Sequence, residues 1–290
     1  MSYSLTAPRS LVTPHPSAVY PFFDKIGVWV QEPLDLDERN AVRRHCLLKR
    51  KLYSDLRPAG FDPRWRQRLE IYQPTPKAVQ TLLSLRRRHY FNYFEPALDW
   101  IYDDSWDRDQ ARAALNHYFV KRYRRRDYDP PRDYGTYYSG PRKTATNPVI
   151  YSDRVCKLTG ELFCVHMDWR MRGKANLENA GIHSLEDLLQ FDHRAFWQAR
   201  LLLLAVDDLR RLGRIHNNHF CGTRRRRDWI EFYGSLYWDM DAWLGRILHT
   251  LFDTQQLLDR FGTKFAVRKC LVAVDASHLL PAQSDRLGLL

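Results

Sequence analysis

The sequence predicts an α+β protein in which an antiparallel sheet is covered by helices on one face and is followed by a C-terminal helical subdomain. Up to about residue 172, runs that alternate apolar and polar residues are interleaved with runs of helical spacing. Beyond Gly173 the apolar residues recur at helical spacing. We expect a disordered lead-in over 1–20, a main domain over 21–212 and a mainly helical subdomain over 213–290.

Local composition predicts each element of the first half. The β-branched and aromatic run 24–31 predicts a strand, and the acidic start at Asp35 begins a helix over 35–49. Residues 68–72 alternate as a strand, prolines at 74 and 76 end it, and 77–85 has helical spacing. The extended aromatic segment 89–102 predicts another strand, and the acidic segment from Asp103 opens a helix that reaches about Arg122.

Three further strands are expected over 135–139, 149–153 and 161–172, the last two joined by a turn at Thr159 and Gly160. A small helix is expected near Leu177, followed by a capping box at 184–187. The last helix is expected over 192–212, with Gly213 closing it.

The charge of the chain favours a polyanionic partner. It has 46 Lys and Arg against 34 Asp and Glu in 290 residues, a formal net charge of +12. Arginine supplies most of the excess and suits bidentate contacts to phosphate. The longest apolar run, 201–206, is far shorter than the roughly 18 residues of a membrane span. The N-terminus lacks the pattern of a secretory signal, so we expect a soluble cytoplasmic protein whose five cysteines are reduced thiols.

Two strands carry candidate chemistry. Glu95, Ala97 and Asp99 share one face of a strand, and two carboxylates with a small residue between them indicate either a divalent metal or a polar sheet edge. On strand 161–172, His166, Asp168, Arg170 and Arg172 share a face. The first two are metal-ligand types and the arginines suit phosphate, although a surface ion-pair ladder has the same pattern.

A tyrosine pair stands between these strands. Tyr137 and Tyr138 precede Gly140 and Arg142, and they face opposite sides of their strand. Tyrosine is a common strand residue, so the pair alone fits an ordinary strand. A tyrosine oxygen can also attack a phosphodiester and hold the new DNA end as a covalent ester.

In order and spacing, residues 90–172 resemble the replication initiation factors of rolling-circle plasmids and phages, the trans-acting Rep type. The family's acid-x-Ala-x-acid strand is matched at 95–99, with Glu95 as the first acid. Its Thr-x-Tyr-x-Gly-x-Arg-x-Ser segment is matched at 136–144, with Thr144 last. Its Arg-x-Tyr-Asp-Lys and Arg-x-Glu strands are matched loosely at 149–154 and 166–168.

The resemblance implies a nickase-like fold and a metal-dependent endonuclease of the relaxase type, which nicks origin DNA and transfers the strand. It implies Tyr138 as the nicking residue, with Tyr137 as the fallback, and Glu95, Asp99 and Asp168 as ligands of Mg²⁺ or Mn²⁺. His166 is a further ligand or a proton carrier. Single-stranded or hairpin origin DNA is the implied substrate. The sequence contains no GxxxxGK[ST] motif, so a separate host or plasmid helicase is an expected partner.

Arginine-rich runs supply the expected DNA contacts. They are 86–88, 121–126 with Arg122, Arg124, Arg125 and Arg126, and 224–227, together with Arg142, Arg170 and Arg172. Solvated surface charge is the ordinary meaning of any one run. Two other functions stay open: a non-catalytic DNA-binding protein on the same scaffold, and an RNA-binding protein with an aromatic sheet.

Overall fold

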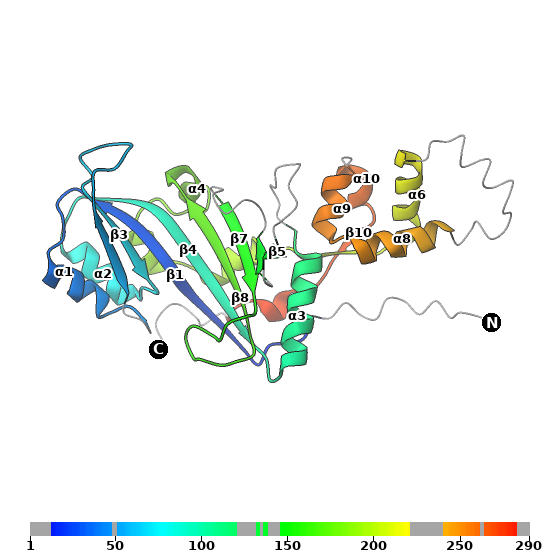
Figure 1. The fold of residues 1–290 in the computed structure, drawn as a ribbon, viewed down its shortest axis with the longest axis horizontal. Helices are drawn as coiled ribbons and strands as arrows, with labels where there is room; N and C mark the ends of the chain where they lie inside the picture. The colour runs from blue at the N-terminus through cyan, green and yellow to red at the C-terminus, as the bar shows by residue number, and fades with distance from the viewer. Residues whose placement is uncertain are drawn as a thin grey trace. The chain divides into compact units, whose positions relative to one another are not determined.

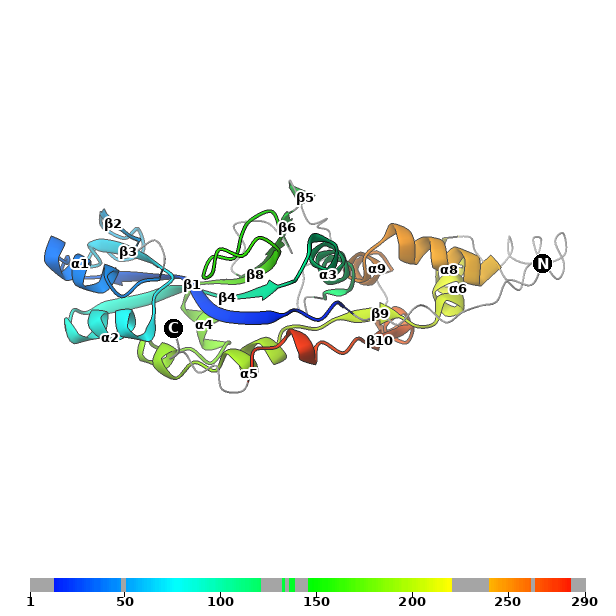
Figure 2. The ribbon, with the colours of Figure 1, turned by 90° about the horizontal axis from the view of Figure 1, so that it is seen from below.

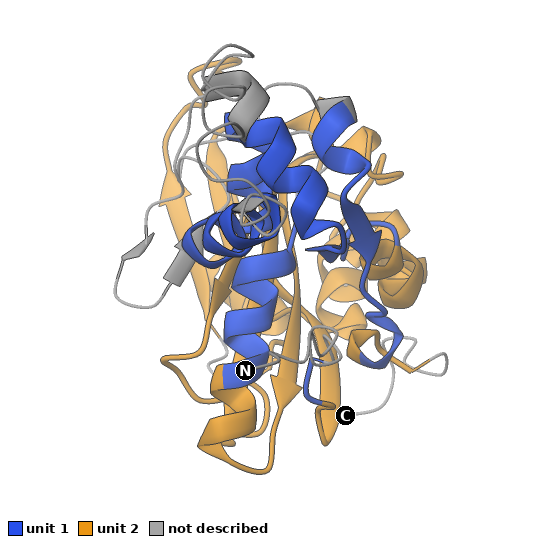
Figure 3. Ribbon diagram, turned by 90° about the vertical axis from the view of Figure 1, so that its right-hand side faces the viewer, with its two compact units in different colours: residues 1–14, 110–129, 199–278 blue, residues 15–109, 130–198, 279–290 orange. Residues whose placement is uncertain are grey.

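The computed structural model describes residues 13–47, 51–120, 132–133, 136–138, 146–220, 240–261 and 264–282. The chain forms two compact units, which Figure 3 distinguishes by colour. The sheet unit contains residues 15–109, 130–198 and 279–290, and the helical unit contains 1–14, 110–129 and 199–278. The boundary expected between 212 and 213 therefore lies inside the helical unit, which starts at Ala199 in this part of the chain.

An eight-stranded sheet with the order β2-β3-β1-β4-β8-β7-β6-β5 forms the sheet unit (Figure 1). Neighbouring strands are antiparallel throughout. The strands are β1 (Ala18–Val30), β2 (Leu52–Leu56), β3 (Gln67–Tyr72), β4 (His89–Ile101), β5 (Arg132–Asp133), β6 (Thr136–Tyr138), β7 (Thr146–Tyr151) and β8 (Cys164–Arg172). The predicted α+β class with an antiparallel sheet is confirmed.

Helices lie against one face of this sheet. Figure 2 shows α2 (Pro76–Ser84), α4 (Lys174–Glu178) and α5 (His193–Gln198) on the same side of it. The unit also contains α1 (Leu36–Arg43) and the 3-10 helix η1 (Glu186–Gln190). The covered face carries buried apolar side chains of alternate strand residues, such as Phe94, Leu98, Met167 and Met171. Period-two alternation thus decides which side of each strand faces the helices.

β1 begins earlier than expected. It starts at Ala18, inside the segment predicted to be a disordered lead-in, because residues 18–23 pair with β4, where Ala18 lies opposite Ile101. Local composition, including Pro21, gave no sign of this pairing. Val19, Tyr20, Phe22 and Phe23 are residue types enriched in strands, and pairing with β4 accommodates Pro21 among them.

The helix predicted over 192–212 is wrong. The structure has α5 over His193–Gln198, then β9 (Leu204–Val206), then α6 (Leu209–Phe220). Residues 204–206, the second half of the apolar run 201–206, pair with β10 (Leu271–Ala273), and a short apolar run cannot be assigned to helix or strand by periodicity alone. Gly213 lies inside α6 instead of closing a helix.

The helical unit is held together by a separate core. It contains α6, α8 (Met240–Leu251), α9 (Thr254–Arg260), α10 (Lys264–Arg268), β9 and β10, and α3 (Ser105–Tyr118) runs into it from the sheet unit. Buried Leu212, Leu248, Leu257 and Phe261 belong to one apolar cluster. α6 and α8 approach so closely that a Cβ on Gly213 would lie 2.0 Å from the carbonyl oxygen of Asp241. Within the described residues, no helix has the length and apolar content needed to cross a bilayer.

Candidate functional site

The register of β4 and β8 brings the four sequence-predicted metal ligands together. Asp99 lies opposite His166, and Ala97 lies opposite Asp168. Residues opposite each other in an antiparallel pair share a face, so Glu95, Asp99, His166 and Asp168 all project from the face away from α4 and α5. All four side chains are buried. We call this group the acid cluster.

Hydrogen bonds connect every member of the acid cluster. Both ring nitrogens of His166 engage carboxylates, Nδ1 that of Asp99 and Nε2 that of Asp168 at 2.5 Å. Arg170 donates from Nε to Glu95 at 2.7 Å and from Nη2 to Asp168 at 3.1 Å. The Tyr93 hydroxyl donates to Glu95 at 2.6 Å. The carboxylates are therefore fixed in place rather than free to rotate.

The arrangement shifts the pKa values of the cluster in opposite directions. Burial, followed by repulsion from Asp168, raises the pKa of Glu95 to about 7. Burial also works against the charged form of Asp168, yet the nearby His166 and Lys157 outweigh it and hold the Asp168 pKa below its usual range. For His166, burial disfavours the cation, but attraction by Asp168 and Asp99 prevails and raises its pKa to about 9. At neutral pH the imidazole is thus protonated, and Glu95 is the member closest to its titration midpoint.

Two residues that the sequence did not single out complete the site. Asp24 lies in a β-bulge of β1, between the paired residues Phe23 and Lys25, and Lys157 belongs to the segment 152–163 between β7 and β8. The Lys157 ammonium lies 2.8 Å from Asp24 Oδ2 and 3.3 Å from His166 Nε2. Its backbone N–H donates to Asp99 at 3.0 Å. Neither residue belongs to a strand with alternating acidic residues. The spacing of acids along the sequence therefore did not identify Asp24 or Lys157 as site residues.

The donor set fits a small divalent cation. Asp24, His166 and Asp168 each offer a ligand atom, and these atoms lie within 4.8 Å of one another. Two carboxylates and an imidazole suit Mn²⁺, and the carboxylates suit Mg²⁺. Metal binding requires the neutral imidazole and room between the ligands, whereas here Lys157 already supplies a positive charge at that place. A metal would therefore have to displace the Lys157 ammonium and the His166 proton.

A second ligand group lies beside the first. Asp99, Cys156 and Cys164 also offer atoms within 4.8 Å of one another, and both cysteines are buried free thiols. A hydrogen bond with Cys164 outweighs burial and lowers the pKa of Cys156 to about 7. Cys156 and Cys164 are free and buried, in agreement with the reduced thiols that the sequence predicted.

The backbone register places residue 138 in line with the acid cluster. Tyr138 of β6 lies opposite Val149 of β7, and Val149 lies opposite Asp168 of β8. Tyr137 lies opposite Ile150, which pairs with Met167 of the helix-covered face. Residue 138 thus takes a position in the row of Asp168, two strands away or roughly 10 Å, and residue 137 takes the other row. The side chains of Tyr137 and Tyr138 lie outside the described part of the molecule.

The predicted DNA-binding arginines divide into two groups. Arg170 is engaged by Glu95 and Asp168, and Arg172 is exposed at the end of β8. Arg122, Arg124, Arg125, Arg126 and Arg142 lie outside the described residues, as does the run 224–227. His216, whose ring is 5.9 Å from that of Phe261, belongs to the helical unit and takes no part in the acid cluster.

No known family model matches this chain, and no curated protein matches it. Among solved structures, the chain is similar to a rolling circle replication initiator protein from Geobacillus stearothermophilus. The TM-score is 0.35 and the sequence identity 8%, over 56% of this chain and 77% of that one. Function is therefore inferred from the geometry of the site.

Proposed function

We propose that this protein is a plasmid or phage replication initiator that nicks and rejoins origin DNA through a tyrosine-phosphodiester intermediate. The observation that carries the proposal is the row of residues across the sheet. The backbone pairing has residue 138 opposite Val149 and Val149 opposite Asp168, a member of the acid cluster. Residue 138 is two strands from Asp168, whose cluster contains buried acids and His166 as a proton carrier.

The proposed chemistry is a reversible phosphoryl transfer. The Tyr138 oxygen attacks the scissile phosphorus, an O–P bond to tyrosine forms, and the P–O3′ bond breaks. The phenol proton passes to a base of the cluster, and the leaving 3′ oxygen takes up a proton. Glu95, with a pKa near 7, suits this proton exchange at neutral pH. Attack by the 3′ hydroxyl on the phosphotyrosine reverses the step and rejoins the strand.

A divalent ion, when bound, would polarise the phosphate and offset the charge that develops on it. Asp24, His166 and Asp168 would hold it, with Asp99 keeping the His166 ring in place. Mg²⁺ or Mn²⁺ is the proposed metal. Arg172 and the arginines near 122–126 and 142 would contact the DNA backbone. We also propose a cytoplasmic location. A separate helicase is the proposed partner, because the sequence lacks a phosphate-binding loop for ATP.

A nicking assay tests the proposal. Supercoiled DNA carrying the neighbouring genomic region is incubated with the protein, with and without Mn²⁺, and denaturing gels detect a protein-linked 5′ end. Tyr138→Phe should abolish the adduct while DNA binding is kept. Tyr137→Phe is the matched control and should leave the adduct intact. The opposite result would transfer the role to Tyr137, and no adduct with or without Mn²⁺ would refute nicking.

A non-catalytic DNA-binding protein is the second candidate, and Lys157 favours it. Asp24 and each carboxylate of the acid cluster have a cationic partner within the chain: Asp24 has Lys157, Asp99 and Asp168 share His166, and Glu95 has Arg170. This pairing offsets much of the carboxylate charge without a metal. Under this alternative the protein retains DNA but forms no adduct. Tighter binding of RNA than of a DNA hairpin would instead favour an RNA-binding function.

A further inference from the structure

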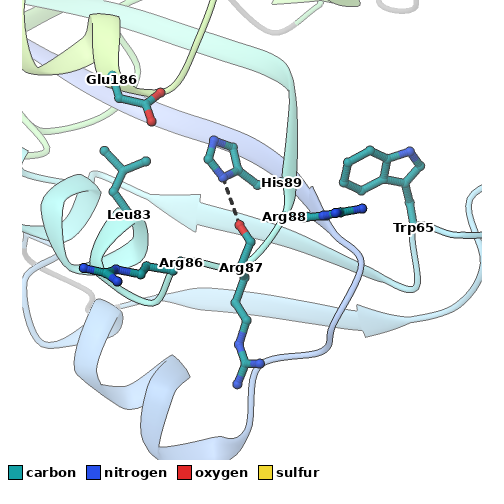
Figure 4. Close-up of a pocket in the computed structure, with 7 residues that line it drawn as sticks. All are labelled: Trp65, Leu83, Arg86, Arg87, Arg88, His89 and Glu186. Carbon is teal, nitrogen blue, oxygen red and sulfur yellow. Dashed lines mark hydrogen bonds between the residues drawn. The ribbon is translucent and has the colours of Figure 1, made fainter.

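A second group of basic and aromatic side chains lies at the other end of β4, outside the acid cluster. A shallow hollow of about 500 Å³ is lined by Trp65, Leu83, Arg86, Arg87, Arg88, His89 and Glu186. Figure 4 shows Trp65 at one end, Leu83 and Arg86 at the other, and Arg88 and His89 between them. The arginines come from the connection between α2 and β4, the first of the arginine runs seen in the sequence.

The three arginines of the hollow are not equivalent. The Arg87 guanidinium points away from the other lining side chains and pairs with Glu38 at 2.7 Å. Arg86 and Arg88 are exposed, and neither forms an ion pair with an acid among the described residues. Two guanidinium groups thus remain available in the hollow, where Glu186 at the rim is the one lining carboxylate. Unpaired guanidinium groups with planar donor geometry are suited to phosphate.

Arg86 has a strained backbone conformation. It follows Leu85, the C-cap residue of α2, its N–H donates to the Leu83 carbonyl at 3.0 Å, and its φ is +53°. Glycine is the usual residue at this left-handed position, because a Cβ is strained there. The arginine thus occupies a position where glycine would relieve strain, and its side chain lines the Leu83 end of the hollow.

Further aromatic rings lie next to Trp65, outside the lining of the hollow. The Trp65 and Tyr90 ring centroids are 5.7 Å apart, and those of Phe61 and Tyr90 are 5.3 Å apart. Phe61 is 58% exposed, a large fraction for a phenylalanine that has two aromatic neighbours. Exposed aromatic rings beside guanidinium groups are the combination with which proteins bind unpaired nucleotides, the rings stacking on bases and the guanidinium groups holding phosphates.

We propose that this hollow binds single-stranded DNA, with the base of one nucleotide against Trp65 and Phe61, a phosphate on Arg88, and a further phosphate of the same strand on Arg86. The volume is within the range of small-ligand sites. The site would hold the strand at a place separate from the acid cluster. The choice of DNA as the ligand rests on the proposed function, whereas the presence of a phosphate-and-base site rests on the hollow alone.

Equilibrium binding to full-length protein tests the proposal. A fluorescein-labelled oligodeoxythymidylate is titrated in EDTA at several salt concentrations, so that no nicking takes place. Arg86→Gly and Arg88→Gln should each weaken binding about tenfold and reduce the magnitude of the salt slope by about 0.7, the value for one lost phosphate contact on a single strand. Trp65→Leu should weaken binding about tenfold with the slope unchanged. Glu186→Gln should tighten it.

Arg64→Gln is the matched control. Arg64 is one residue from Trp65, its side chain is 78% exposed and it pairs with Asp62, but it does not line the hollow. Its variant should bind within about twofold of the wild type. Arg86→Gly should also keep or raise the Tm, because glycine adopts a positive φ without strain. Losses for Arg86→Gly and Arg88→Gln no larger than for Arg64→Gln would overturn the proposal.

Two further outcomes separate this site from the nicking activity. If the hollow variants lose binding while the wild type forms no covalent adduct, the nucleotide site stands and the nicking function fails. If the adduct forms but the hollow variants bind normally, the nucleotide site fails alone. Tighter binding of oligouridylate than of the DNA oligomer would overturn the choice of DNA.

Discussion

The Lys157 ammonium stands where a divalent ion would bind, so its removal should increase metal affinity. It contacts Asp24 and His166, two of the three residues whose ligand atoms converge. A hydrogen bond to a charged group contributes about 1.5–3 kcal/mol, and the incoming metal must break it. Lys157→Met, similar in length but uncharged, should therefore bind Mn²⁺ about ten- to a hundredfold more tightly than the wild type.

The same change should destabilise the metal-free protein. It leaves Asp24 without its ion-pair partner in a partly buried place, at a cost of about 2 kcal/mol after allowance for solvent screening. The Tm without metal should fall by about 5 °C. Saturating Mn²⁺ should then stabilise the variant by about 1.4–2.8 kcal/mol more than the wild type, since tenfold tighter binding adds about 1.4 kcal/mol.

Titration of Mn²⁺ followed by the electron paramagnetic resonance of the free ion measures the affinity without relying on activity. Lys25→Met is the matched control, because Lys25 and Lys157 have side chains that are 20% and 21% exposed. Lys25 contacts Glu70 and Glu95, each at 3.9 Å, outside the Asp24, His166 and Asp168 group. A Lys157→Met affinity no higher than that of Lys25→Met would refute competition between the ammonium and the metal.

Two further predictions concern stability. His193 is buried against Phe23 and Phe191, and desolvation lowers its pKa to about 3, so the unfolded chain binds its proton first as the pH falls below about 6.5. Urea unfolding at pH 7 and pH 5 should show that the wild type loses about 2 kcal/mol more than His193→Phe; equal losses would contradict this. Gly213→Ala should cost about 1–3 kcal/mol, since its Cβ would meet Asp241 at 2.0 Å, whereas a higher Tm would contradict the close packing of α6 and α8.

The sequence pattern predicted the strands of the site, because the alternation of apolar and charged residues matches the two faces of a strand in the folded protein. The charged and apolar residues of 165–172 alternate without exception, and β8 buries the apolar set under the helices. The same rule put Glu95 with Asp99 and His166 with Asp168 on single faces. That the two pairs meet depends on the register of β4 with β8, which periodicity does not contain. The family resemblance supplied that link as an expectation.

Contacts between distant segments account for what the sequence did not predict. Asp24 joins the site through a bulge after Phe23, and a bulge changes which residues share a face. The apolar residues of the run 201–206 fit either a helix or a strand. What makes residues 204–206 a strand is pairing with β10, which lies more than sixty residues further along the chain. Gly213 resembled a helix end, whereas its lack of a side chain serves close helix packing.

Arg170 and Lys157, two cations beside the acid cluster, are held in place differently by the chain. Arg170 lies on β8 itself, two residues from Asp168, so its contacts with Glu95 and Asp168 are built into the sheet. Lys157 is carried by the segment 152–163, whose backbone is tied to the cluster by the hydrogen bond from Lys157 N–H to Asp99. Movement of that segment would withdraw the Lys157 ammonium from Asp24 and His166, whereas Arg170 on β8 would still hold Asp168. Conversion of the ion-paired network into a metal site would therefore need displacement of the segment between β7 and β8 together with loss of the His166 proton.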